Sequence, residues 1–174
     1  MVKKPNGQWR PCGDYRALNR ITVPDRYPLP HIHDVNIQLH NKTIFSRLDL
    51  EKAFNQIKMA EEDLPKTAII TPFGSFEFLK MPYRLRNSSQ TFQRFINEII
   101  RALPFAVAYI DDILIFSDSK KQHKEHLSAV LEILAQHGIK INLEKCSFEQ
   151  ESITFLGHQI SKKERYQTQK KLKV

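Results

Sequence analysis

Apolar residues recur at spacings of three and four between Ser88 and Leu103. A stripe with this period predicts an amphipathic helix whose apolar face packs against a core. The stripe consists of Phe92, Phe95, Ile96, Ile99, Ile100 and Leu103. A similar stripe predicts a second helix over about 120–137, where the side chain of Asp118 or Ser119 can cap the first turn.

Shorter runs of β-branched and aromatic residues predict strands before, between and after these helices. The predicted strands are 44–50, 66–71, 76–81, 105–108, 113–116, 139–142, 146–148 and 153–160, with a short helix at 51–59. The second and third strands form one hairpin, and the last two form another around Gln150-Glu151. Residues 1–43 carry many prolines and turn residues, which predict an irregular basic lobe. Strands interleaved with two amphipathic helices favour an α+β fold, an antiparallel sheet with helices on one face.

Two adjacent carboxylates, Asp111 and Asp112, stand between the apolar runs 105–108 and 113–116. Adjacent aspartates repel each other, and carboxylates within apolar sequence need a positive partner such as a divalent cation. A β-turn with two solvated aspartates is the plain alternative. In the predicted sheet, the strand that carries Asp49 can lie beside this hairpin, so that three carboxylates meet at one edge.

Three carboxylates on adjacent strands can bind two cations that hold the attacking and leaving oxygens of a phosphoryl transfer. Mg²⁺ prefers such oxygen ligands. Nucleases and polymerases both use this arrangement, so the carboxylates leave that choice open. The sequence contains no P-loop, no Gly-x-Gly-x-x-Gly motif and no Ser-His-Asp arrangement. The pairs His31/His33 and His123/His126 are interpreted as surface or helix-face residues.

The 174 residues include 27 Lys and Arg against 19 Asp and Glu, which gives a net charge of +8. This excess indicates a polyanionic partner, although solubility explains it equally well. No apolar run is long enough to cross a membrane and the first residues show no signal-peptide pattern, so no membrane association is expected. Cys12 and Cys146 cannot form a zinc site alone and are expected to be reduced thiols in a cytoplasmic protein.

Six short motifs occur in a characteristic order and spacing. They are Trp9-Arg10-Pro11-Cys12-Gly13-Asp14-Tyr15-Arg16-Ala17-Leu18-Asn19, Phe45-Ser46-Arg47-Leu48-Asp49-Leu50, Thr71-Pro72-Phe73-Gly74, Thr91-Phe92-Gln93-Arg94, Tyr109-Ile110-Asp111-Asp112 and Phe155-Leu156-Gly157-His158. With these motifs, the chain resembles the reverse transcriptase domain of long-terminal-repeat retrotransposons, especially the gypsy class, from Val2 to about Lys171. The resemblance implies a partial copy of an RNA-directed DNA polymerase, with a palm, partial fingers and no thumb. The implied ranges are partial fingers at 1–43 and 60–82, palm at 44–59 and 83–160, and a basic tail at 161–174.

The resemblance also implies roles for individual residues. Asp49, Asp111 and Asp112 match the catalytic residues that bind two Mg²⁺ ions, for which Mn²⁺ can substitute. The implied nucleotide-binding residues are Lys3, Arg10, Phe54, Tyr83 and Lys145. Among them, Phe54 matches the aromatic residue that rejects a ribose 2′-hydroxyl, and Lys145 matches a lysine that protonates the leaving pyrophosphate. The implied primer and template contacts are Arg16, Arg84, Gln90, Arg94, Tyr109, Gly157 and His158.

The chain departs from the family pattern at Arg84, where glycine is usual, at Ser89, where proline is usual, and at Gly13, where valine is usual. The change at Gly13 is interpreted as one that slightly weakens a strand. A glycine at position 84 would let the backbone approach the nucleotide closely, whereas Arg84 brings in a long cation. Two alternatives therefore stay open: a catalytically silent, transposon-derived nucleic-acid-binding module, and a structural domain without a nucleic-acid role. The partners implied by the resemblance are a primed RNA or DNA template, deoxynucleoside triphosphates, and Pol segments such as ribonuclease H and integrase. The implied location is a cytoplasmic virus-like particle.

Overall fold

The computed structural model describes residues 2–3, 7, 9–10, 13–31, 35 and 37–162. The chain divides into two compact units. The first unit comprises Met1–Pro28 and Lys52–Arg94, and the second comprises Leu29–Glu51 and Phe95–Val174. The fingers and palm ranges given above stay a prediction.

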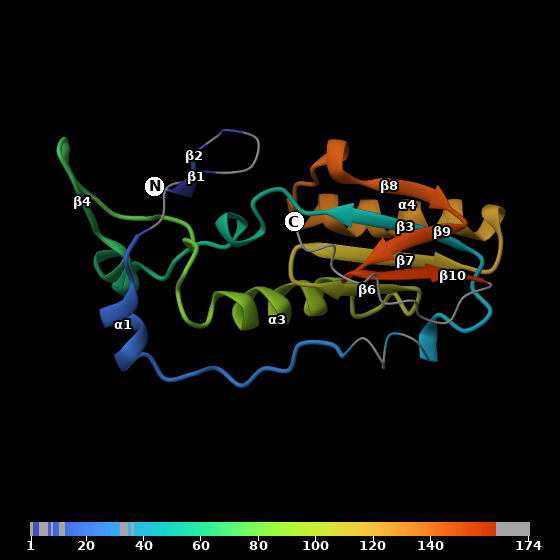
Figure 1. Ribbon diagram of the computed structural model, residues 1–174, viewed down its shortest axis with the longest axis horizontal. Helices are drawn as coiled ribbons and strands as arrows, with labels where there is room; N and C mark the ends of the chain where they lie inside the picture. The colour runs from blue at the N-terminus through green and yellow to red at the C-terminus, as the bar shows by residue number, and fades with distance from the viewer. Residues whose placement is uncertain are drawn as a thin grey trace, which may run out of the picture. The chain divides into compact units, whose positions relative to one another are not determined.

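The second unit is built on a four-stranded antiparallel sheet in the order β6-β7-β3-β8 (Figure 1). Its strands are β3 (Ile44–Asp49), β6 (Ala106–Tyr109), β7 (Asp112–Ser117) and β8 (Ser147–Gln150). Strands β3 and β7 pair along their whole length, from Ile44 opposite Ser117 to Asp49 opposite Asp112. Nine of the twelve residues of these two strands are buried, because both faces of the sheet are covered.

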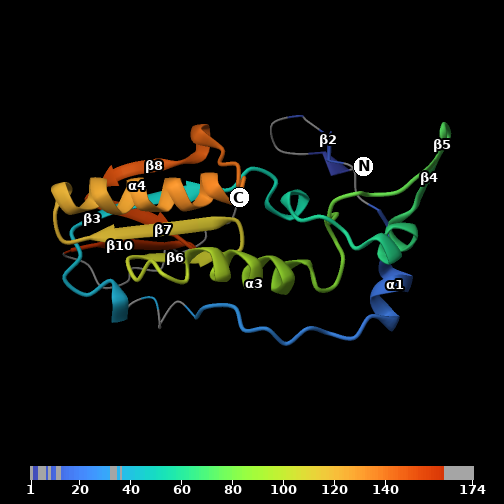
Figure 2. The ribbon, with the colours of Figure 1, turned by 180° about the vertical axis from the view of Figure 1, so that it is seen from behind.

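Helix α4 (Lys120–Gln136) packs on one face of β3 and β7 and lies in front of the sheet in Figure 2. A hairpin of β9 (Ser152–Phe155) and β10 (His158–Ser161) packs on the other face. One core joins this hairpin to the sheet through Phe45, Leu114, Phe116, Ile153, Phe155 and Ile160. Burial of these large apolar side chains fixes β3 against β7 and therefore fixes the ends of both strands.

The two predicted helices are confirmed as α3 (Ser88–Ile100) and α4. Helix α3 ends before the last apolar residue of its stripe, because Leu103 N–H bonds to Ile100 O in a separate turn. Ser119 caps α4, since its side chain accepts a hydrogen bond from the Gln122 N–H. The two types of predicted element, helix and antiparallel sheet, confirm the α+β class.

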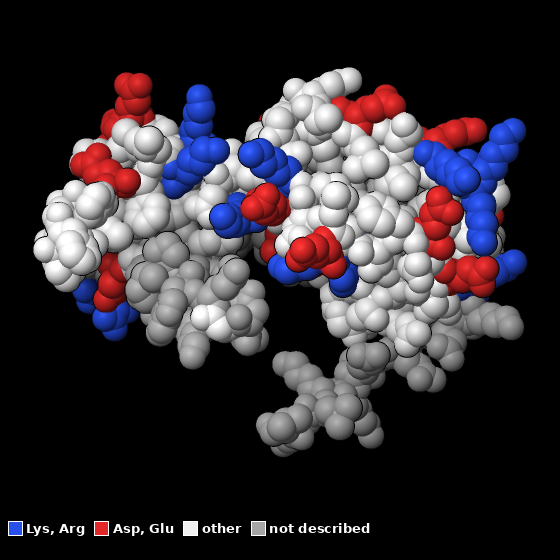
Figure 3. Space-filling view, turned by 90° about the horizontal axis from the view of Figure 1, so that it is seen from above, with Lys and Arg blue, Asp and Glu red and all other residues white. Residues whose placement is uncertain are grey.

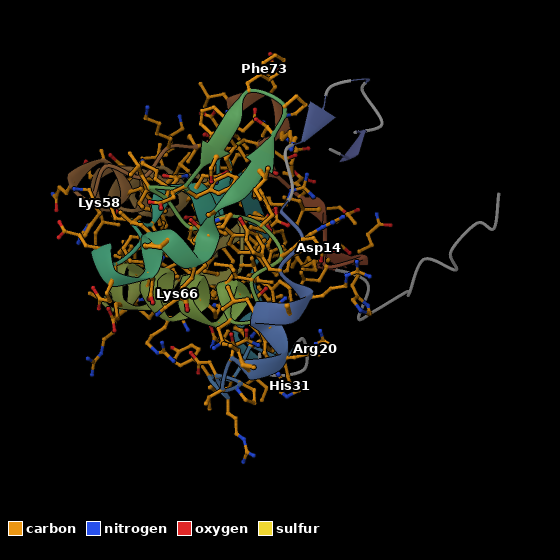
Figure 4. All side chains as sticks on the ribbon, turned by 90° about the vertical axis from the view of Figure 1, so that its left-hand side faces the viewer. Asp14, Arg20, His31, Lys58, Lys66 and Phe73 are labelled. Atoms are coloured by element: carbon orange, nitrogen blue, oxygen red, sulfur yellow. The ribbon has the colours of Figure 1, made fainter. Side chains whose placement is uncertain are left out.

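Apart from residues 88–94 of α3, the described residues of the first unit form short elements. They are β1 (Val2–Lys3), β2 (Trp9–Arg10), α1 (Arg16–Ile21), the 3-10 helices η1 (Ala53–Gln56) and η2 (Glu61–Thr67), β4 (Ile69–Thr71) and β5 (Gly74–Phe76). The helix predicted over 51–59 is wrong and is reduced to η1, whose entry through Lys52 at φ 47 interrupts helical geometry. The predicted hairpin exists but is shorter, and Phe73 lies at its tip with 91% of its surface exposed (Figure 4).

The predicted last hairpin, between 146–148 and 153–160, is wrong. Strand β8 pairs with β3 instead, and β9 pairs with β10 around Leu156 and Gly157. Leu156 and Gly157 both have positive φ, 51° and 78°, the geometry of a tight two-residue turn. The strand predicted at 139–142 is also wrong. A single bridge between Leu50 and Ile141 takes its place, and η3 (Leu143–Lys145) follows.

Of the two interpretations given above, surface or helix face, His123 fits the second: it lies on the face of α4 that packs on the sheet and is fully buried. Its Nε2 is 2.6 Å from Ser46 Oγ on β3, and its Nδ1 is 2.8 Å from Ser117 Oγ on β7. Ser117 Oγ also lies 2.8 Å from His126 Nδ1, and Ser46 Oγ accepts a bond from Glu149 N–H at 3.0 Å. This polar network ties α4 to three strands. His31 is exposed as expected, and His33 lies outside the described residues.

None of the helices within the described ranges is both long enough and apolar enough to span a bilayer. On the face shown in Figure 3, acidic and basic side chains of the described residues are interspersed.

Candidate catalytic site

Three carboxylates gather at one end of the sheet in the second unit. Asp49 is the last residue of β3 and stands opposite Asp112, the first residue of β7. Asp111 immediately precedes β7, and its carbonyl accepts a 2.7 Å hydrogen bond from the Leu50 N–H. The predicted approach of the Asp49 strand to the Asp111-Asp112 hairpin is confirmed. It arises because β3 and β7 pair in register to their last residues.

The turn that carries Asp111 is strained. Tyr109 pairs with Asp112, so Ile110 and Asp111 are the two turn residues. Ile110 has φ 53, a left-handed conformation that is unusual for a β-branched residue. Such a conformation costs on the order of 1–3 kcal/mol and persists only where the surrounding structure enforces it. Here the buried strands β6 and β7 enforce the turn, and it places Asp111 beside Asp112.

Electrostatics at this strand end disfavour negative charge. Burial raises the pKa of Asp49, and the nearby Asp111 carboxylate raises that pKa further. Burial also raises the pKa of Asp112, with Asp111 and Asp49 adding to the effect. Carboxylates whose pKa is raised by burial and by neighbouring carboxylates are stabilised in the charged form by a bound cation.

Two basic side chains of the same unit partly balance the three carboxylates. Lys145 Nζ lies 3.6 Å from Asp49 Oδ2, and Arg47 Nε lies 3.9 Å from Asp112 Oδ1. The Arg47 guanidinium also donates to Thr154 O at 3.2 Å and to Lys145 O at 3.4 Å, so it is fixed to β9 and η3. Lys145 makes the shorter of the two contacts, but its side chain is 65% exposed. These two cations act against the rise of the Asp49 and Asp112 pKa values.

Sequence reasoning missed Arg47 and a contact of Cys146. Arg47 precedes Asp49 by two residues on β3, so both side chains lie on one face of the strand, and this alternation was the available signal. Cys146 Sγ accepts a hydrogen bond from the Asp49 N–H at 3.4 Å. No local pattern reveals that contact, because 97 residues separate the partners along the chain.

Three aspartates supply the hard oxygen donors that a divalent cation takes. Among the described residues, however, no three acidic, histidine or cysteine side chains stand close enough to hold a metal ion as placed. The donor chemistry fits a metal ion, and the carboxylates would have to turn toward it on binding.

Other predicted site residues lie in the first unit. The rings of Phe54 and Tyr83 have their centroids 5.3 Å apart, and those of Phe54 and Phe92 lie 5.9 Å apart. Arg94 pairs with Asp25 at 2.6 Å and stacks over Tyr27 at 4.8 Å.

Further predicted contacts are spread over both units. In the first unit, Gln90 Oε1 is buried and has no hydrogen-bond partner within the described ranges. In the second unit, Tyr109 stands opposite Asp112, while Gly157 and His158 lie at the β9–β10 turn. The side chains of Lys3 and Arg10 lie outside the described residues.

Arginines surround helix α1 in the first unit. A cavity of about 720 Å³ is lined by Asp14, Arg16, Ala17, Asn19, Arg20 and Arg86. An adjoining pocket of about 330 Å³ includes Arg84. Figure 4 labels Asp14, which precedes the helix, and Arg20, which lies in its last turn. Arg16 Nη2 lies 2.6 Å from Asp14 Oδ2. The hydrogen bonds from Arg16 lower the pKa of Asp14 to about 2. Several guanidinium groups around one cavity favour an anion such as phosphate.

Comparison with known proteins decides the family. The profile of the family described as reverse transcriptase (RNA-dependent DNA polymerase) matches residues 2–160. The chain belongs to the reverse transcriptase family. It is 43% identical over 162 residues to the retrovirus-related Pol polyprotein from transposon 297 of Drosophila melanogaster. The aligned region covers 90% of this chain and 15% of that polyprotein. To the Pol polyprotein from transposon gypsy of the same fly, it is 37% identical over 151 residues, covering 86% of this chain and 15% of the polyprotein.

Solved structures agree with this assignment. A foamy viral protease–reverse transcriptase in complex with double-stranded DNA superposes with a TM-score of 0.84 at 25% identity, covering 92% of this chain and 28% of that one. A second such complex gives a TM-score of 0.83 at 27% identity, covering 97% and 35%. The resemblance to a gypsy-class reverse transcriptase domain is thereby confirmed. This reverse transcriptase chain spans about 15% of the length of the transposon polyproteins it matches.

Proposed function

We propose that this chain is the catalytic part of an RNA-directed DNA polymerase that extends a primer 3′-hydroxyl with deoxynucleotides and releases pyrophosphate. The observation that carries the proposal is the pairing of Asp49 with Asp112, next to Asp111, at one sheet end of a reverse transcriptase family member. Antiparallel pairing of β3 with β7 brings Asp49, which is distant in sequence, next to Asp112 and to Asp111 in the strained turn. A sheet that needed these residues for folding alone would gain nothing from clustered like charge.

The three aspartates would hold two Mg²⁺ ions, which supply neutralisation and alignment of the attacking and leaving oxygens when bound. Asp49 and Asp112 stand on paired strands, so their spacing is set by the sheet rather than by flexible loops. Arg47, fixed by two carbonyls, would keep Asp112 oriented. Lys145 would leave Asp49 when a cation takes its place, and its exposed ammonium could then give a proton to the leaving pyrophosphate.

Template and primer binding is the second part of the proposal. The arginines around α1 would contact phosphates, since guanidinium groups bind them in bidentate fashion. Phe54 and Tyr83 form an aromatic pair suited to lie against a nucleotide. The solved foamy viral relatives were captured with double-stranded DNA and with an RNA/DNA hybrid, which supports a nucleic-acid duplex as the partner. Deoxynucleoside triphosphates, other Pol segments and a cytoplasmic virus-like particle complete the proposed setting.

Primer extension on an RNA template tests this function. The chain, with a thumb segment from a related transposon polyprotein supplied, is expected to extend a DNA primer in the presence of Mg²⁺. Asp111→Asn is expected to abolish extension, because it removes one of the three carboxylates. Asp118→Asn is the matched control, since Asp118 pairs with Lys42 away from the strand end. No extension by the parent chain with the thumb supplied, or equal extension by the Asp111→Asn variant, would contradict the proposal.

One observation favours a second candidate, a catalytically silent nucleic-acid-binding module. Arg84 has φ 75, a left-handed conformation that glycine adopts without strain, and its long side chain occupies the loop before α3. This candidate predicts duplex binding that weakens as salt rises, without any extension. Gain of extension by Arg84→Gly would reject a purely binding role.

A further inference from the structure

The side chain of Asn19 bonds to the loop formed by residues 83–87 at two points. Its Nδ2 donates to Arg84 O at 2.8 Å, and its Oδ1 accepts from Arg86 N–H at 2.9 Å. Arg86 returns the contact, because its Nη1 donates to Asn19 O at 3.0 Å and to Thr22 O at 3.3 Å. All of these residues belong to the first unit. The amide of Asn19 therefore acts like a short piece of paired strand against the loop.

A second asparagine repeats the arrangement from the opposite side. Asn87 Oδ1 accepts from Asp25 N–H at 3.0 Å, and Asn87 Nδ2 donates to Val23 O at 2.8 Å. Two amide side chains thus join the segment 19–25 to the loop 83–87 without a backbone ladder. Each amide uses one donor and one acceptor, so neither can be replaced by a carboxylate without loss of a donor.

The Asn19 contacts begin at the strained residue of the loop, Arg84. Arg84 has φ 75, a conformation that side chains other than glycine rarely adopt. Such geometry persists only where surrounding contacts enforce it. The bond to Arg84 O and the bond to Arg86 N–H lie on the two sides of Leu85, and together they fix the turn after Arg84.

The loop also carries Tyr83, whose ring lies 5.3 Å from Phe54 between centroids. We propose that Asn19 is a positioning residue that holds Arg84 in its left-handed conformation and thereby sets Tyr83 and Arg84 for the nucleotide. The inference rests on the proposed polymerase function for its consequence in catalysis. Its structural part, the clamp on the loop, stands on the hydrogen bonds alone.

Hydrogen exchange at the Arg86 amide tests the clamp without any activity. Asn19→Ala removes the acceptor, so exchange of this amide is expected to speed up at least about tenfold. Asn19→Asp keeps an acceptor for Arg86 N–H and is expected to keep most of the protection. Thr22→Val is the matched control at the same helix end, since Thr22 Oγ1 bonds only to Leu18 O among the described residues. Unchanged exchange in Asn19→Ala would overturn the clamp.

Epistasis with position 84 tests the positioning role, in the primer-extension reaction described above. Asn19→Ala is expected to raise the KM for the nucleotide about tenfold with a much smaller change in kcat. In an Arg84→Gly background, the same change is expected to cost less than about threefold, because glycine adopts φ 75 without help. Equal losses in both backgrounds would overturn the positioning role. If the parent chain shows no extension, the polymerase proposal fails, and the exchange measurement alone decides the clamp.

Discussion

Replacement of His123 by leucine is expected to weaken the fold by removing a buried polar junction while keeping most of its volume. His123 bonds to Ser46 Oγ on β3 and to Ser117 Oγ on β7, and it is fully buried. In the variant each hydroxyl keeps one other partner, Glu149 N–H for Ser46 and His126 for Ser117. Two hydrogen bonds are lost and each hydroxyl keeps a partner, so the expected loss is about 1–3 kcal/mol of unfolding free energy.

The pH dependence gives this prediction a second, independent readout. Burial lowers the pKa of His123. Two charged or titratable groups also act on this pKa: Glu149 raises it and His126 lowers it. The unfolded chain binds a proton near pH 6.5, and the folded chain binds it only at lower pH. The contribution of His123 is therefore fully present above about pH 6.5 and is lost as the pH falls toward the folded value.

Urea unfolding of the parent chain and the His123→Leu variant at pH 8 and pH 5.5 measures both effects. The parent is expected to lose more stability on acidification than the variant, which has no such group. The raised pKa values of Asp49 and Asp112 favour folding at lower pH, the opposite of the His123 effect. Both proteins carry these aspartates, so their effect cancels when the two pH dependences are subtracted. His137→Leu is the matched control, because His137 is exposed at the end of α4. A loss below about 1 kcal/mol at pH 8, or equal pH slopes, would refute the reasoning.

Three further changes have expected outcomes in the same unfolding assay. Arg84→Gly is expected to raise the unfolding free energy by about 0.5–1 kcal/mol, because relief of left-handed backbone strain exceeds the added chain entropy of glycine; a decrease would contradict this. Ser119→Ala is expected to lower it by about 1 kcal/mol through loss of the cap on Gln122 N–H, and no change would show that the cap is dispensable. Asp112→Asn is expected to raise it by about 1 kcal/mol at pH 7, since burial and neighbouring carboxylates disfavour the charged form, whereas a loss would show that Arg47 outweighs them.

Helix α3 and much of the second unit could be predicted because their signals are local. The stripe in α3, the cap at Ser119 and the apolar runs around Asp111 and Asp112 each reside within one window of sequence. Pairing of the Asp49 strand with that hairpin followed from the need of an antiparallel sheet to bury both apolar runs. The candidate carboxylates were found for the same reason.

The errors arose where long-range contacts decide the structure. The last hairpin was placed around Gln150-Glu151, but the positive φ of Leu156 allows a tight turn with Gly157 that sequence alone does not reveal. Strand β8 pairs with β3 instead, and the Glu149 N–H donates to Ser46 Oγ, which lies far away along the chain. Leucine at the first position of this turn has no compositional signal, and Gly157 alone did not decide the position of the hairpin.

Gly13 shows how a single residue can be misread without its neighbours. It was interpreted as a change that weakens a strand. In the structure it is buried, and a Cβ there would collide with the ring of Tyr15. The Tyr15 hydroxyl donates to Thr67 O at 3.0 Å, which holds that ring in place. The glycine thus makes room for a tertiary contact.

Binding of Mn²⁺, followed by the electron paramagnetic resonance signal of the free ion, tests most directly whether the three aspartates form one metal site. The parent chain and Asp118→Asn are expected to bind the ion equally, while Asp49→Asn is expected to bind it at least about tenfold more weakly, because one carboxylate is lost from paired strands. Binding that is absent in the parent chain, or unchanged in the Asp49→Asn variant, would contradict the shared site.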